Sequence, residues 1–200
     1  MELMSFLAHM KKRRTIYAIG KNVPITADQI EEIIKEAVRN SPSAFNSQTS
    51  RVVTLYGDSH EKFWSIVRET LRKIVSETAF EKTNEKINNF AAGYGTVLFF
   101  EDQDTVKSLQ EQFPSYAEHF PAWSEHSTGI AQFAVWSSLA EHNIGASLQH
   151  YNPVIDEEVA ATFDIPKNWK LRAELVFGSI EALAGEKTFL DDSVRFKRFN

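Results

Sequence analysis

A polar loop at residues 41–48 places five hydrogen-bonding side chains within eight positions. Pro42 fixes one backbone angle and restricts Ser41 to an extended conformation. The loop could therefore present several donors and acceptors to a flat polar ligand at a low entropic cost. Serine, asparagine and proline are also common in turns for purely local reasons, so an ordinary helix-to-strand connection is the alternative interpretation.

Two basic clusters, near opposite ends of the chain, have side chains suited to a phosphate group. Residues 11–14 read Lys-Lys-Arg-Arg and are followed by Thr15, while residues 195–199 alternate cations with phenylalanines. Guanidinium groups bind phosphate oxygens in bidentate fashion, and a threonine hydroxyl adds a neutral donor. A solvated basic patch is the alternative for the first cluster, and a frayed charged terminus is the alternative for the second.

The sequence lacks the motifs of enzymes in which side chains or a bound metal carry out the reaction. The nearest histidine pair, His119 and His126, flanks a proline, so no metal site is expected. There is no Gly-x-Ser-x-Gly elbow, and Gly93-x-Gly95 precedes a strand and lacks the third glycine of a dinucleotide loop. The absence of cysteine excludes disulfides and thiolate chemistry. If the protein is an enzyme, a cofactor is expected to supply the chemistry.

Length and composition fit one compact domain spanning residues 1–200, because 42% of the residues are hydrophobic. The formal net charge is -5 and neither sign forms a long run, so no nucleic-acid or membrane partner is expected. No uninterrupted apolar stretch approaches the length of a membrane span or a signal-peptide core. A cytoplasmic protein is the default expectation.

Hydrophobic periodicity predicts the elements that must position these residues. A capping box at Thr26 and Gln29 begins a helix that ends before Pro42. The aromatic segment 114–123 could either cover a core or form a lid over a planar ligand. Besides an opening helix through Met10, the predicted helices are 26–40, 59–74, part of 77–89, 104–113, 127–142, which is apolar on most of its surface, and 156–163, and the predicted strands are 51–56, 96–100, 146–149 and 171–178.

Four motifs considered together resemble the FMN-dependent nitroreductase family. They occur in the order and spacing of that family, and the resemblance covers essentially the whole chain. The short middle region is most similar to the compact branch that contains fatty-acid-repression-mutant-like proteins and a copper-induced bacterial nitroreductase. The motifs are residues 13–15, 41–48, 145–153 and 195–199.

The resemblance implies an α+β fold in which a mixed, mainly antiparallel sheet is enclosed by helices. It also implies an intertwined homodimer that binds two FMN molecules at the subunit interface, each contacted by both chains. The apolar helix 127–142 would be the long central helix of this arrangement. Tyr17 departs from the family pattern, because many relatives carry a basic residue there, near the flavin pyrimidine edge.

The resemblance also assigns residues to the cofactor. Arg13, Arg14 and Thr15 match the phosphate and ribityl contacts, and Arg195 and Lys197 match a terminal pair that returns to the phosphate and ring edge. The flavin contacts come from a loop of the other subunit and from a segment whose backbone N–H groups approach flavin N5. They are Pro42, Ser43, Ala44 and Asn46 in the loop, and Gln149, His150 and Tyr151 in the segment.

The implied activity is that of an FMN-dependent NAD(P)H oxidoreductase. Hydride would pass from NADH or NADPH to flavin N5 and then to a small planar acceptor, a nitroaromatic or a quinone, in a ping-pong cycle. No side chain is expected to serve as a catalytic acid or base. The alternatives are a flavin-binding regulator of the lipid, metal or oxidative stress response, a specialised flavin enzyme with a different substrate, and a structural domain without flavin.

Overall fold

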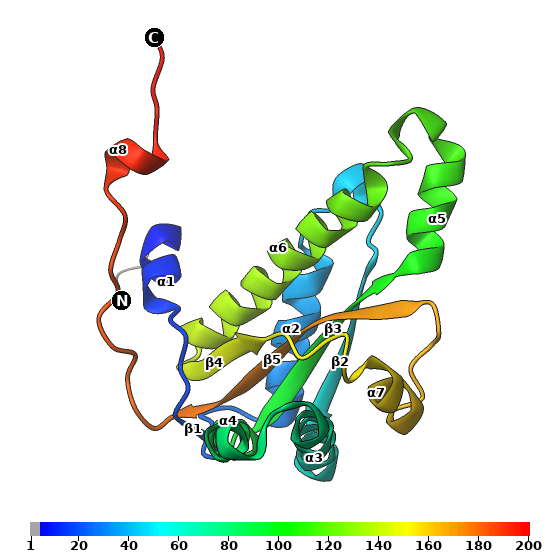
Figure 1. The fold of residues 1–200 in the computed structure, drawn as a ribbon. Coiled ribbons are helices and arrows are strands. Elements are labelled where there is room, and N and C mark those ends of the chain that lie inside the picture. The colour runs from blue at the N-terminus through cyan, green and yellow to red at the C-terminus, as the bar shows by residue number, and fades with distance from the viewer. Residues whose placement is uncertain (1–4) are drawn as a thin grey trace.

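The computed structural model, which describes residues 5–200, arranges five strands into one sheet with helices on both faces (Figure 1). The paired strands are antiparallel, in the order β1-β5-β3-β2, and β4 also pairs with β5. The α+β, mainly antiparallel architecture predicted from the sequence is confirmed. The strands are β1 (Ile19–Gly20), β2 (Ser50–Tyr56), β3 (Gly95–Asp102), β4 (Ile144–Gln149) and β5 (Trp169–Ile180).

The helices account for most of the remaining chain. They are α1 (Phe6–Lys12), α2 (Ala27–Arg39), α3 (Gly57–Ile74), α4 (Glu77–Ala91), α5 (Gln103–Gln112), α6 (Phe120–Glu141), α7 (Asp156–Thr162) and α8 (Asp192–Arg195), with short 3₁₀ turns at η1 (Ala44–Asn46) and η2 (Pro114–Tyr116). Of the predicted opening helix, residues 1–4 lie outside the described residues. None of the helices found in residues 5–200 is long and apolar enough to span a membrane.

The central strand β3 contributes to two hydrophobic cores, because successive side chains of a strand point to opposite faces. Val97 and Phe99 pack in a cluster with residues of α2 and α6. Leu98 and Phe100 pack in a second cluster with residues of α3, α4 and α7. Helices therefore cover both faces of the sheet, which explains why all of β3 is buried and reads as a continuous apolar run.

The helix before the polar loop forms as its sequence predicts. Thr26 Oγ1 accepts a hydrogen bond from the Gln29 N–H at 3.3 Å, and Gln29 Oε1 accepts one from the Thr26 N–H at 3.0 Å. This reciprocal capping box fixes the first turn of α2. The helix ends at Arg39, three residues before Pro42, and the polar loop leaves it at a defined point.

The long helix α6 differs from its prediction at both its start and its surface. It begins at Phe120, seven residues before the predicted start at 127, and includes the second half of the aromatic segment. Pro121 is tolerated because the first helical turn has no backbone donor to lose there. The helix is also less uniformly apolar than predicted, since several of its buried side chains are polar: Ser124, Ser127, Thr128 and Gln132.

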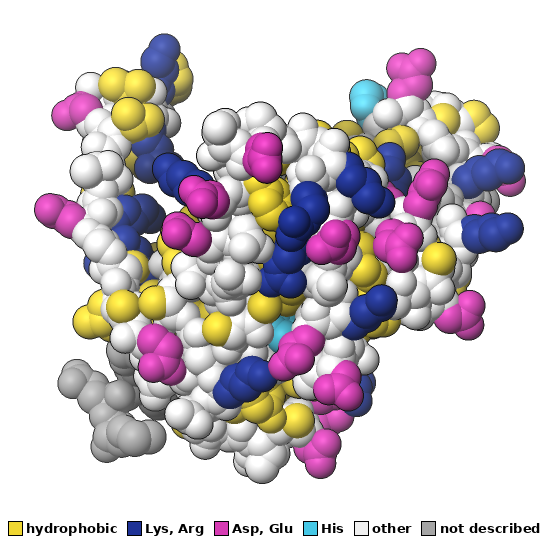
Figure 2. Space-filling model, turned by 60° about the horizontal axis from the view of Figure 1, so that its bottom comes forward, with side chains coloured by type: hydrophobic (Ala, Val, Ile, Leu, Met, Phe, Trp, Pro, Cys, Tyr) yellow, Lys and Arg dark blue, Asp and Glu magenta, His cyan; other side chains and the backbone are white. Residues whose placement is uncertain are grey.

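The C-terminal segment after β5 forms an arm that stands away from the body of the molecule (Figure 1). Its one short helix, α8, was not predicted, nor was the two-residue strand β1, because neither is long enough to show a periodic pattern. Large apolar side chains of the arm are exposed, including Leu183 at 86% and Phe199 at 89%. The face of the body turned forward in Figure 2 carries intermixed cations and carboxylates, without a field of one sign.

Candidate functional site

A cationic cavity of about 490 Å³ lies between the N-terminal segment, α6 and the base of the C-terminal arm. Three cations contribute to its wall, and its described lining residues include no carboxylate. Glu186 instead lines an adjoining hollow. The residues that line the cationic cavity are Arg13, Arg14, Thr15, Gly129, Gln132, Phe133, Trp136, Leu148 and Lys187.

Strand β4 holds the segment that carries the two arginines. Where α1 ends, Arg13 adopts an extended conformation, and Thr15 forms a parallel bridge to Ala146. The Ile16 N–H then donates to the Ala146 carbonyl at 3.0 Å. Gly145 permits this close approach, because a Cβ there would lie 2.9 Å from the Ile16 side chain. The backbone therefore sets the place of the arginines along β4.

Buried donors in the cationic cavity lack partners. The Arg13 guanidinium lies 4.4 Å from the centre of the Trp136 ring. Arg13 Nε and Trp136 Nε1 are both buried and find no hydrogen-bond partner within residues 5–200. Burial, and then the positive charge of Arg14, lowers the pKa of Arg13. Unsatisfied donors beside clustered positive charge favour an anion, and a phosphate monoester has the charge and the acceptors to satisfy them.

The end of β4 leads from the cationic cavity to the predicted flavin segment. Gln149 is buried and donates through Nε2 to Ser147 Oγ at 3.1 Å, while His150 is exposed. The Tyr151 ring packs against Trp64, with centroids 5.9 Å apart. Burial, and then the negative charge of Glu174, raises the pKa of the Tyr151 phenol to about 12. Tyr151 therefore directs its side chain into the core, and its N–H donates to Glu174 Oε2 at 2.9 Å.

A second cavity, of about 450 Å³, lies at the N-terminal half of α6 and is mostly aromatic and apolar. The polar loop forms one wall and α6 forms the other. We call it the aromatic cavity. Its lining residues are Pro42, Ser43, Ala44, Phe45, Trp123, His126, Ser127 and Ile130.

A hydrogen bond within the polar loop and the packing of the Phe45 ring hold the loop in its conformation. Ser43 Oγ accepts from the Gln48 N–H at 2.9 Å. Phe45, Asn46 and Gln48 all have positive φ, between 48° and 57°, which non-glycine residues adopt only when their surroundings require it. The Phe45 ring supplies such a constraint, because it packs against the rings of Phe113 at 4.9 Å and of α6 residues.

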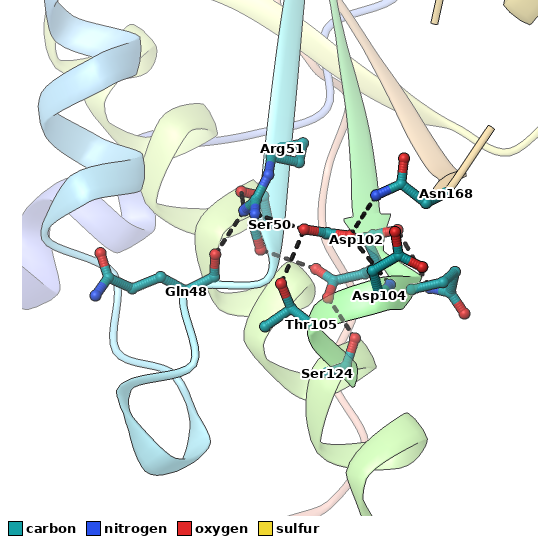
Figure 3. A network of polar contacts seen from close by, with 10 residues as sticks. Gln48, Ser50, Arg51, Asp102, Asp104, Thr105, Ser124 and Asn168 are labelled. Carbon is teal, nitrogen blue, oxygen red and sulfur yellow. Dashed lines mark hydrogen bonds and ion pairs between the residues drawn. The ribbon is translucent and has the colours of Figure 1, made fainter. Parts of the chain in front are cut away.

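A polar network anchors the exit of the loop to the sheet (Figure 3). Arg51 donates to the Gln48 carbonyl and to Asp102 Oδ2, both at 2.7 Å. Burial opposes ionisation of Asp102, but hydrogen bonds from Thr105 and Asn168, together with the charge of Arg51, lower its pKa. The end of the loop, where it enters β2, is therefore tied to both β2 and β3.

The aromatic segment 114–123 lies beside this loop. The sequence left open whether it covers the core or forms a lid. Tyr116 is 48% exposed and Phe113 is 37% exposed, so the segment is not sealed into the core. His119 stacks on Trp123, with ring centroids 5.5 Å apart. Together with Phe45, these rings form a partly open aromatic surface.

The predicted site residues fall into separate groups within one chain. Residues 13–15 and β4 meet at the cationic cavity, whereas the loop residues Pro42, Ser43 and Ala44 line the aromatic cavity and Asn46 is exposed beside it. Within residues 5–200, neither Arg195 nor Lys197 lines either cavity; both are exposed on the arm.

Some lining residues were not identified from the sequence. Lys187 occupies the cationic cavity where the terminal cations were expected, and Arg14 donates to the nearby Gly185 carbonyl at 2.7 Å. Gln132 and Trp136, which are four residues apart on α6, could have been recognised as one helical face. A further cavity of about 350 Å³ places Tyr17 beside residues of α4: Lys82, Glu85, Lys86, Asn89 and Phe90.

Comparisons with known proteins identify the family of the chain and support its fold. The model of the nitroreductase family matches residues 10–179. The Saccharomyces cerevisiae nitroreductase FRM2 is 33% identical over 192 residues, 95% of each chain. The structure of nitroreductase CinD from Lactococcus lactis in complex with nicotinic acid is 54% identical, with a TM-score of 0.91 over 98% of this chain and 100% of that one.

A putative nitroreductase from Desulfovibrio desulfuricans in complex with FMN has the same fold, with a TM-score of 0.72, 14% identity and full coverage of both chains. The resemblance stated from the sequence motifs is therefore confirmed, including its compact branch. The chain belongs to the nitroreductase family and is a flavin-dependent oxidoreductase.

Proposed function

We propose that the protein is a cytoplasmic FMN-dependent NAD(P)H oxidoreductase that reduces nitroaromatics and quinones by two-electron transfer in a ping-pong cycle. The observation that carries this proposal is the cationic cavity, in which the buried donors of Arg13 and Trp136 find no partner within residues 5–200. This donor set fits the FMN phosphate. When bound, FMN would supply the redox chemistry by accepting hydride and returning it to an acceptor.

The residues of the chain would bind the cofactor and orient it. Arg13, Arg14 and Lys187 would neutralise the phosphate, and Thr15 would add a neutral donor. Gln149, His150 and Tyr151 would approach the isoalloxazine through the backbone at the end of β4. No side chain is assigned a proton-transfer role, because His126 is the one titratable group among the described residues that line the aromatic cavity, and solvent reaches it.

The pyrimidine edge of the flavin would lie near Tyr17 and α4. Tyr17 stands where the family pattern has a basic residue, and Lys82 and Lys86 line the same cavity. Lys86 Nζ lies 5.5 Å from the centre of the Phe90 ring. A cation from α4 would therefore replace the missing one and favour the anionic reduced flavin electrostatically.

A homodimer would bring the separate groups together. The polar loop and the cationic cavity lie along different parts of α6, so the loop would contact the cofactor held by a partner chain. The exposed apolar side chains of the C-terminal arm support the same assembly, because packing on a partner would bury them. Arg195 and Lys197 would then reach the partner's cofactor.

The aromatic cavity is suited to planar acceptors. Phe45 is 51% exposed and offers a ring surface for stacking beside Trp123, and the exposed His126 offers a hydrogen bond. CinD has been solved in complex with nicotinic acid, with chloramphenicol and with 4-nitrophenol, each of which contains an aromatic ring. Aromatic and quinonoid acceptors are the corresponding class for this chain.

The proposal is tested by the visible spectrum of the full chain with added FMN, recorded anaerobically before NADH or NADPH, after it, and after a quinone. Bleaching followed by recovery, with sustained turnover, is the expected result. Bound FMN that neither nicotinamide reduces would instead favour a flavin-binding regulator, since a regulator shares the binding residues. Failure to bind FMN would contradict both functions.

A further inference from the structure

Glu174 is a buried carboxyl group at the point where β4 ends. It lies on β5, opposite Leu98 of β3 on one side and Gln149, the last residue of β4, on the other. Its exposed fraction is 0%. A carboxyl group in the middle of a sheet with both faces covered loses its hydration. Its burial therefore costs free energy unless its oxygen atoms gain hydrogen bonds within the protein.

The contacts of Glu174 are with the chain that follows β4. Its Oε2 accepts a hydrogen bond from the Tyr151 N–H at 2.9 Å. Because the ladder with β5 stops at Gln149, the Tyr151 N–H has no strand partner of its own, and the carboxyl group takes that place. The side chain therefore determines where the backbone goes after the sheet ends.

Three buried oxygen atoms near this point have no donor within residues 5–200: Glu174 Oε1, Asn152 Oδ1 and Asp156 Oδ1. An ionised Glu174 would leave all of them as acceptors. A proton on Glu174 would convert one acceptor into a donor and reduce this deficit.

We propose that Glu174 is a positioning residue that, as a neutral carboxylic acid, holds the backbone of residues 150–152 in the conformation that meets the flavin. This inference rests on the proposed function only for the identity of the ligand. The acid acts through Tyr151 and touches no reacting atom. The chemistry resembles that of a buried amide, with one acceptor oxygen and one donor.

The electrostatics of the site agree with this role. Burial, with a smaller contribution from the charge of Asp156, raises the pKa of Glu174 to about 8, although the N–H groups of Tyr151 and Asn152 oppose the shift. The groups that face it are the Tyr151 phenol from the loop and Asp156 from α7. Burial also raises the pKa of Asp156, and the charge of Lys170 on β5 opposes that shift. Glu174 would be mainly protonated at pH 7.

A matched control is available in Glu101, the other buried glutamate of the sheet. It lies on β3, where Ser50 donates to its Oε1 at 2.9 Å and Ser124 donates to its Oε2. Burial raises its pKa as well, but its partners are hydroxyl groups away from the flavin segment. E101Q therefore changes a buried carboxyl without changing the support of residues 150–152.

The test is site-resolved hydrogen exchange of the Tyr151 amide in the full chain, with and without added FMN, together with the rate of flavin reduction by NADH. E174Q should keep the Tyr151 protection factor and the reduction rate within about threefold of wild type, because an amide supplies the same acceptor. E174L should lose protection by about 10- to 100-fold and reduce flavin more slowly. E101Q should leave the Tyr151 protection factor unchanged.

The pH profile supplies a readout that does not depend on E174L folding. Wild-type protection at Tyr151 should fall as pH rises towards about 8 and level off above it, because Glu174 ionises more readily when the segment opens than when it is closed. E174Q should show no such fall. Protection that is independent of pH in wild type, or E174Q behaving like E174L, would overturn the proposal. So would normal flavin reduction in a folded E174L. If wild type binds no FMN, the proposed function fails, whereas the exchange data still decide whether Glu174 holds the segment.

Discussion

The two cavities along α6 recognise different chemistry. The cationic cavity presents Arg13, Arg14 and Lys187, and its buried donors lack partners within residues 5–200. The aromatic cavity presents Phe45 and Trp123, and its described lining residues include no lysine or arginine. One cavity is suited to the charged end of a cofactor and the other to a planar ring, so under the proposed function each would be half of a site.

The two cavities are also held in different ways. A backbone bridge between Thr15 and Ala146 fixes the cationic cavity, and it depends on the secondary structure of the sheet. Ring packing and positive-φ residues fix the aromatic cavity, with Arg51 anchoring the loop to Asp102. Substitutions in the cationic cavity should change cofactor affinity, and substitutions of the aromatic rings in the second cavity should change acceptor selection.

The largest effect is expected from Arg13→Ala. It removes the stacking on Trp136 and, under the proposed function, a charge-assisted phosphate contact, so FMN affinity should fall by about 10- to 100-fold. Equilibrium titration of flavin fluorescence measures this. Lys62→Ala, which removes an exposed cation of α3, is the control and should leave affinity unchanged. Equal affinity in Arg13→Ala and wild type would remove the cationic cavity from the site.

Trp123→Leu should separate the two cavities. Losing a stacking surface should raise KM for a planar quinone by about 3- to 10-fold while FMN affinity stays the same. Ferricyanide, which does not stack, serves as the control acceptor and should react equally well in both proteins. A loss of FMN affinity with an unchanged quinone KM would mean that the roles of the cavities are reversed.

Lys187→Ala should have a smaller effect, because this side chain is exposed. We expect FMN affinity to fall by about two- to fivefold. Lys197→Ala is the informative comparison, since Lys197 lies in neither cavity of its own chain. A comparable loss in Lys197→Ala would indicate that the partner's arm completes the phosphate site. No loss would assign that role to Lys187 alone.

Features that depend on neighbouring residues, such as the start of a helix or a buried strand, can be predicted from the sequence. Thr26 and Gln29 identify the start of α2, and the apolar run of β3 identifies the buried central strand. The family motifs identified residues 13–15 and 145–153 separately, and the structure brings them together at one cavity wall through the bridge to Ala146.

The remaining part depends on contacts between distant residues. Lys187 lines the same cavity as Arg13 because of the path that the chain takes after β5, and no pattern in residues 181–190 predicts that path. The start of α6 was missed because Pro121 usually ends a helical pattern, although it is acceptable in a first turn. Glu174 follows Arg172 at a polar position of an alternating strand pattern, which does not indicate a buried carboxyl, and its partner Tyr151 is known only from the fold.

The central claim is that one chain supplies the cationic half of each site and its partner supplies the loop. The direct measurement uses a mixed dimer, isolated with two affinity tags, that joins an Arg13→Ala chain to an Asn46→Ala chain. If the halves meet across the interface, both substitutions fall in one site and the other site is intact. The mixed dimer should then bind one FMN with wild-type affinity, unlike either mutant homodimer. A mixed dimer without a wild-type site would contradict the account.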